Sequence, residues 1–119
     1  MAAKIRRGDD ELPLSPPVFY VLLAVADRER HGYAIMQEVE QRTEGKIRLL
    51  PGSLYSTLKR MVAGSLIEEC DGLTDVGSDD ERRRYYRITQ QGRKVAAAEA
   101  DRMATLISLA RSKHLTTAS

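Results

Sequence analysis

The chain has 119 residues, 42% of them hydrophobic and 30% charged, which suits one folded domain with a modest core and excludes a disordered chain. Its net charge of +2 does not by itself indicate a polyanionic partner, so local patches must decide. Cys70 is the single cysteine, and no signal-peptide core or apolar run near ~20 residues is present. A cytoplasmic protein without a membrane partner is therefore expected.

Residues 1–14 are charged and lack periodicity, which predicts a flexible arm. Ser15-Pro16-Pro17 predicts a helix start, in which the serine side chain accepts from free N–H groups and proline occupies the first turn. Residues 18–26 are apolar almost all round, so this helix should be central and buried.

His31 opens a second predicted helix, which runs to about Thr43 and ends before Gly45. A short strand is expected at 46–50. A third helix begins in PGSLYSTLKRM, residues 51–61, and closes near Gly64.

Two further strands are expected at 66–71 and 82–88, on either side of a polar, acidic loop. Thr89 is a predicted N-cap for a last helix from about Gln90 to His114. The order of elements predicts a mainly α fold with a small β-wing: a winged helix-turn-helix at 15–89, followed by a dimerisation helix and tail at 90–119. In this fold the third helix enters the DNA major groove.

The third helix has two unlike faces. Leu54, Leu58, Met61 and Val62 form an apolar stripe, and there is no acid between Ile47 and Glu68. Its other face carries the candidate DNA contacts, which are Ser53, Tyr55, Ser56, Lys59 and Arg60. Two plainer interpretations stay open: Tyr55 packs at the edge of the core, and the two cations only keep the surface soluble.

The returning strand is unusually basic. Alternation places Tyr86 and Ile88 on the inner face, and Tyr85 and Arg87 on the outer face. The candidate phosphate clamp consists of Arg82, Arg83 and Arg84. The alternative is that these arginines neutralise the acids at 79–81.

The last helix has a heptad-like apolar seam, which predicts a homodimer interface. The seam consists of Ala96, Ala100, Met103, Ile107 and Ala110.

Three segments together resemble the PadR family of bacterial transcriptional regulators: HGYAIMQEVEQRT at 31–43, PGSLYSTLKRMVAGSLIEE at 51–69 and RRRYYRITQQGR at 82–93. The resemblance covers about residues 14–114 and looks like the short subclass with one helix after the wing. It implies a dimeric winged-helix repressor that binds double-stranded DNA at a palindromic operator. It adds Tyr33 near the DNA backbone, and it implies a small-molecule effector that this sequence does not identify.

Two features depart from the family pattern. No cation lies between Cys70 and Arg82, so the acidic wing loop should be repelled by phosphates. The chain has no tryptophan, so the drug-binding mode of some relatives does not carry over.

Two other classes of function fit this sequence less well than DNA binding. A winged helix used only for protein interaction is the alternative, although such modules tend to lose the basic face that is present here. No nucleophile–base set, metal-ligand spacing or phosphate-cradling glycine loop occurs, so neither an enzyme nor a cofactor is expected. Cys70 is interpreted as a packing residue, with a redox sensor as the alternative.

Overall fold

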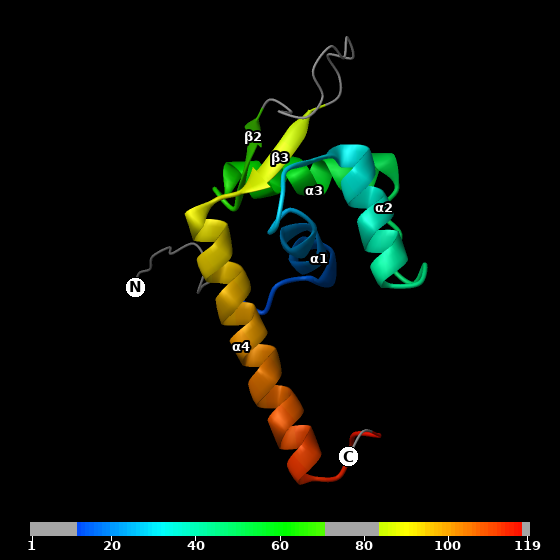
Figure 1. The fold of residues 1–119 in the computed structure, drawn as a ribbon, viewed down its shortest axis with the longest axis vertical. Helices are drawn as coiled ribbons and strands as arrows, with labels where there is room; N and C mark the ends of the chain where they lie inside the picture. Colours follow the sequence, from blue (N-terminus) through cyan, green and yellow to red (C-terminus); the bar gives the residue numbers. More distant parts are fainter. Residues whose placement is uncertain (1–11, 71–83, 118–119) are drawn as a thin grey trace.

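The structure is a computed structural model that describes residues 12–70 and 84–117. Its elements, in chain order, are α1 (Pro16–Ala24), β1 (Arg30–His31), α2 (Gly32–Arg42), α3 (Pro51–Ala63), β2 (Ile67–Cys70), β3 (Tyr85–Ile88) and α4 (Gln90–Ser112). The three strands form an antiparallel sheet in the order β1-β3-β2. Figure 1 shows α1 between α2 and α4, beneath α3 and the wing. The predicted mainly helical fold with a small wing is confirmed.

The core surrounds α1, as its apolar sequence predicts. Val21 and Leu22 are completely buried there, and Ile35 of α2 and Leu54 of α3 pack in the same cluster. Leu14 also lies in this core, with 8% of its surface exposed, so its assignment to a flexible arm is wrong. The chain before residue 12 lies outside the described residues. No helix in the described ranges combines the length and apolarity needed to cross a bilayer.

Of the residues that begin the predicted helices, His31 and Thr89 cap them with their side chains. The Ala34 N–H donates to Nδ1 of His31 at 3.2 Å, and the Gly92 N–H donates to the Thr89 hydroxyl at 2.9 Å. Ser15 occupies the N-cap of α1 but makes no such bond. Pro17 stands at the second helical position and has no N–H to donate, which leaves the Val18 N–H as the one usual donor to this cap, and Ser15 does not engage it.

The third strand is not where the sequence placed it. Residues 46–50 form a loop, held where the Ile47 N–H donates to the Thr43 hydroxyl at 3.0 Å. The partner of β3 is instead β1, with Arg30 opposite Tyr86 and His31 opposite Tyr85. A two-residue strand carries too little hydrophobic pattern to be predicted from sequence.

This strand also changes the environment of Tyr85. Alternation predicted an outward side chain, yet Tyr85 is 9% exposed. The His31 ring packs edge-on against the Tyr85 ring, with centroids 5.4 Å apart, and so covers the face that was expected to meet solvent. Tyr86 is buried on the opposite face, as predicted.

A glycine sets the approach of α4 to the rest of the domain. A Cβ on Gly92 would overlap the Leu66 carbonyl oxygen and lie 2.9 Å from Cγ1 of Ile88. The same carbonyl accepts from the Thr89 N–H at 3.1 Å. Any side chain at position 92 would therefore push the first turn of α4 away from the segment that joins α3 to β2.

The change Gly92→Ala should lower the free energy of unfolding by about 1–3 kcal/mol, because the new methyl group meets backbone that cannot move aside. Gly52→Ala is the matched control. It also lies in the first turn of a helix, with open space around the new Cβ, and should cost nothing or stabilise by up to about 1 kcal/mol. Urea unfolding measures both. Equal stabilities for the two variants would contradict the close approach at Gly92.

Candidate nucleic-acid interface

Helix α3 presents the two faces that its sequence predicts. Leu54, Leu58 and Met61 are buried, and Thr57 is buried beside them, which the sequence did not indicate. The opposite face is exposed and carries Ser53, Ser56, Lys59 and Arg60. The helix begins at Pro51, so Ser53 is its third residue rather than its start.

The first turn of α3 has no side-chain cap. The N-cap residue is Leu50, which has no hydrogen-bonding side chain and is 61% exposed. Helix N-termini carry partial positive charge and free N–H groups, which favour anions. The exposed hydroxyl of Ser53 lies in this turn. Both ends of the exposed face are thus suited to negative charge, with the helix N-terminus at one and Lys59 and Arg60 at the other.

Tyr55 lies between α3 and the first turn of α2. A Cβ on Gly32 would be 3.0 Å from its hydroxyl oxygen and 3.2 Å from Cε1, so glycine at 32 lets the ring approach. Tyr55 is nevertheless 48% exposed. One edge of the Tyr55 ring therefore packs against α2, as the packing interpretation held, while the other edge remains on the surface. Tyr33 is 57% exposed in the same turn of α2, and its ring stacks near that of His31.

The cations of α3 and those of the wing have different surroundings. Within the described residues, Lys59 and Arg60 form no ion pair. Arg84, in contrast, donates from Nη1 to Oε1 of Glu69 at 2.8 Å, and Arg87 donates from Nε to Oε2 of Glu68 at 2.7 Å. The acid partners lie on β2, across the ladder from β3.

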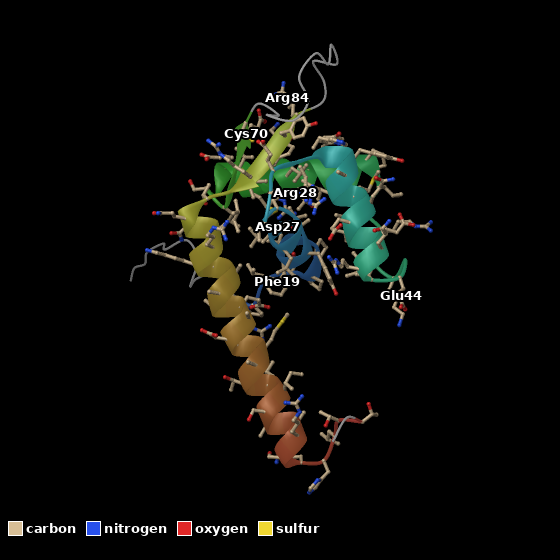
Figure 2. All side chains as sticks on the ribbon, viewed as in Figure 1. Phe19, Asp27, Arg28, Glu44, Cys70 and Arg84 are labelled. Atoms are coloured by element: carbon tan, nitrogen blue, oxygen red, sulfur yellow. The ribbon has the colours of Figure 1, made fainter. Side chains whose placement is uncertain are left out.

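These pairs bear on the predicted phosphate clamp. Arg84 is paired, as the alternative interpretation held, but with Glu69 rather than with the acids of the loop. The side chains of Arg84 and Glu69 are 60% and 45% exposed, and a pair so open to water contributes about 0–1 kcal/mol. Figure 2 shows Arg84 at the end of the wing strands, beside the grey trace. Arg82, Arg83 and the acidic loop lie outside the described residues.

A cleft separates α3 from the wing. The side chains of Tyr55 and Lys59 line one wall, and Tyr86, Glu69 and Arg84 line the other. A phosphate that entered this cleft would meet Lys59 without competition but would compete with Glu69 for Arg84.

Helix α4 has an apolar surface that its own domain does not cover. Of the predicted seam, Ala96 packs against the core, Ala100 is exposed, and Ala110 is half-buried. Met103 is 38% exposed and Ile107 46%. Leu106 and Leu109, which were not predicted, are 50% and 52% exposed on the same half of the helix. Their spacing from Met103 was the available signal.

Cys70 lies at the end of β2 (Figure 2) and is held by an acid. Its Sγ–H donates to Oε1 of Glu29 at 3.0 Å. Burial, the hydrogen bond to Glu29 and the negative charge of Glu29 raise the pKa of Cys70 to about 12. Reactive cysteines have lowered pKa values, so this environment supports the packing interpretation over the redox sensor.

Native Cys70 should therefore react slowly with Ellman's reagent at pH 8, because its thiolate fraction is roughly a thousandfold below that of an unperturbed thiol. Glu29→Gln removes the charge and weakens the acceptor but leaves the burial, so the rate should rise part of the way. The guanidinium-unfolded chain provides the unperturbed rate. A native rate equal to the unfolded rate would show that the thiol is not protected.

The geometry defines a winged helix-turn-helix protein whose third helix presents a basic, acid-free face. Comparison with known proteins agrees: the profile of the transcriptional regulator PadR-like family matches residues 21–98. The chain belongs to the PadR-like family of transcriptional regulators. Members of this family are transcriptional regulators and not enzymes, which agrees with the expectation from the sequence.

Individual proteins resemble the chain in sequence or in fold. The chain is 38% identical over 85 residues to transcriptional regulator Rv3488 of Mycobacterium tuberculosis, covering 71% of each chain. It is 36% identical over 73 residues to uncharacterized protein X of Lysinibacillus sphaericus, covering 61% of this chain and 64% of that one. A PadR-like transcriptional regulator of Bacillus cereus shares the fold, with a TM-score of 0.69 at 20% identity over 83% of this chain and 91% of the other.

Proposed function

We propose that this protein is a sequence-specific DNA-binding regulator that inserts α3 into the major groove of an operator. The observation that carries this proposal is the exposed face of α3, where Lys59 and Arg60 form no ion pair within the described residues. Groove-reading helices need cations near phosphates and small polar groups near base edges. Ser53, Ser56 and the exposed edge of Tyr55 supply the second requirement.

We also propose that the protein acts as a homodimer on a palindromic site, as a cytoplasmic repressor that an unidentified small molecule releases. Support for the dimer comes from the half of α4 that carries Met103, Leu106 and Ile107, which are 38–50% exposed. Adjacent apolar side chains left on a surface indicate an interface, and two-fold symmetric dimers are the commonest solution. Residues 15–89 would then bind DNA and residues 90–119 would dimerise.

Replacing Lys59 or Arg60 with Ala should weaken operator binding and flatten its salt dependence, with the slope changing by about one unit for each lost phosphate contact. Lys113→Ala is the charge-matched control, since Lys113 follows the far end of α4 (Figure 1). Fluorescence anisotropy at several salt concentrations gives the slopes. If both α3 variants keep the slope of the unmodified protein, α3 does not face the phosphates.

Replacing Ile107 with Asp should split the dimer, because a carboxylate would have to be buried in an apolar interface. Thr105→Asp is the control: it lies roughly 160° away around the same helix and is exposed. Light scattering at micromolar concentration distinguishes the two. Dimers from both variants would place the interface elsewhere.

The first experiment for the whole proposal is anisotropy with DNA from upstream of the protein's own gene and with scrambled DNA, each at two salt concentrations. Tight, sequence-preferring and salt-sensitive binding supports the regulator proposal. Absence of binding even at low salt would instead favour the winged helix as a protein-interaction module.

A further inference from the structure

Helix α4 contains a carboxylate that the proposed function does not use. Glu99 has no exposed surface, whereas its neighbours Ala100 and Asp101 are exposed. Burying a charge is unfavourable unless it is paired and hydrogen-bonded. A methionine or leucine would fill this position without that cost, so the presence of an acid needs a reason.

The partners of Glu99 come from two directions. Arg102, one turn along α4, donates from Nε to Oε1 at 2.9 Å and from Nη2 to Oε2 at 2.7 Å. The Leu14 backbone N–H also donates to the carboxylate, and this bond and Arg102 hold the pKa of Glu99 below its usual value. Leu14 belongs to the core segment that enters α1. The arginine therefore fixes the carboxylate on α4, and the carboxylate fixes α4 to the segment before α1.

The positions of the anchors along α4 matter. Gly92 and Thr89 hold the start of the helix against Leu66, and Arg93 reaches the Ala26 carbonyl at 2.7 Å. Glu99 lies seven residues after Gly92, two turns and about 10 Å along the same face. Two anchors at different points along a helix fix the direction of its axis. Beyond Arg102 the helix runs away from the other elements (Figure 1), so Glu99 is its last buried polar anchor in the described chain.

We infer that Glu99 is a positioning residue, which fixes the direction in which α4 leaves the winged-helix domain and thereby the half-site spacing that the dimer accepts. This inference rests on the proposed dimeric DNA binding. A hydrogen-bonded carboxylate is directional, whereas apolar contacts such as those of Val95 allow the helix to tilt. Buried ionic groups are frequently replaced by apolar ones without loss of stability, so the acid here contributes geometric specificity.

The test uses a two-fold duplex selected from random DNA by the unmodified protein, and derivatives with one, two or five base pairs inserted at its centre. Five base pairs rotate the half-sites by about half a turn. The unmodified protein should bind the parent site about tenfold more tightly than the sites with one or two added base pairs. Glu99→Met should leave the fold and the dimer intact. This variant should bind the parent site no more than about threefold more tightly than the sites with one or two added base pairs. Glu99→Gln, which retains an acceptor for the Leu14 N–H, should keep most of the preference for the parent spacing.

Asp101→Asn is the matched control, since it removes an exposed carboxylate two residues away. A purely structural role for Glu99 would lower affinity equally for every spacing, and this outcome would overturn the inference. If Glu99→Met does not fold, the double variant Glu99→Leu and Arg102→Met takes its place, because replacing both partners leaves no buried charge without a partner.

A measurement without DNA separates this inference from the proposed function. Spin labels at Gln41→Cys and Ser112→Cys, in a Cys70→Ser background diluted with unlabelled protein, report the distance from α2 to the far end of α4. Double electron–electron resonance should give a narrow distribution that broadens with Glu99→Met but not with Asp101→Asn. Equal widths would overturn the inference. A selected duplex without two-fold symmetry would contradict the dimeric operator while leaving this readout intact.

Discussion

The backbone of Leu66 connects three elements of this fold, α3, β2 and α4. Its oxygen accepts from the Thr89 N–H, the Thr89 hydroxyl donates to the adjacent Ser65 carbonyl at 2.5 Å, and the Leu66 N–H donates to the Met61 carbonyl of α3. The end of α3, the start of β2 and the start of α4 are thus joined through one residue. Gly92 makes the junction possible because it leaves room for that oxygen. A movement of α4 at this point must therefore move α3 or break these bonds.

The distribution of charge follows from strand pairing rather than from composition. Glu68 lies opposite Arg87 in the ladder and pairs with it, and Glu69, which lies opposite Tyr86, pairs with Arg84 just before β3. Within the described residues no acid pairs with Lys59 or Arg60 of α3, and the helix has no acid of its own. Its positive charge consequently remains directed at solvent, although the chain as a whole carries a net charge of only +2. Exposed charges act over roughly a Debye length, so the local surface and not the total decides the attraction.

The sequence predicted the helices well because each carries its own signal. The apolar stripe of α3, the Thr89 cap and the long pattern of α4 are local features, and local features can be read without a fold. The strand β1 and the burial of Tyr85 could not be predicted, because both arise when His31 meets a residue more than fifty positions away. The pairing of Arg84 with Glu69 was missed for the same reason: sequence proximity favoured the acids of the loop, whereas the strand register selected β2. Leu14 was assigned to the arm because two leucines on either side of a proline, Leu12 and Leu14, give no helical periodicity.

The outer half of α4 has a consequence for how the molecule folds. From Met103 to Ser112 the helix extends past its last anchor for ten residues, all exposed except Ala110, and most helical stability in proteins comes from tertiary packing. In a lone protomer these turns would depend on intrinsic propensity and would fray. In the proposed dimer, association would supply the missing packing, and the helical content of this segment would rise with protein concentration. Circular dichroism over a dilution series would reveal this dependence, and a constant signal through dissociation would exclude it. The outer turns of α4 would then become stably helical when a second protomer packs against them.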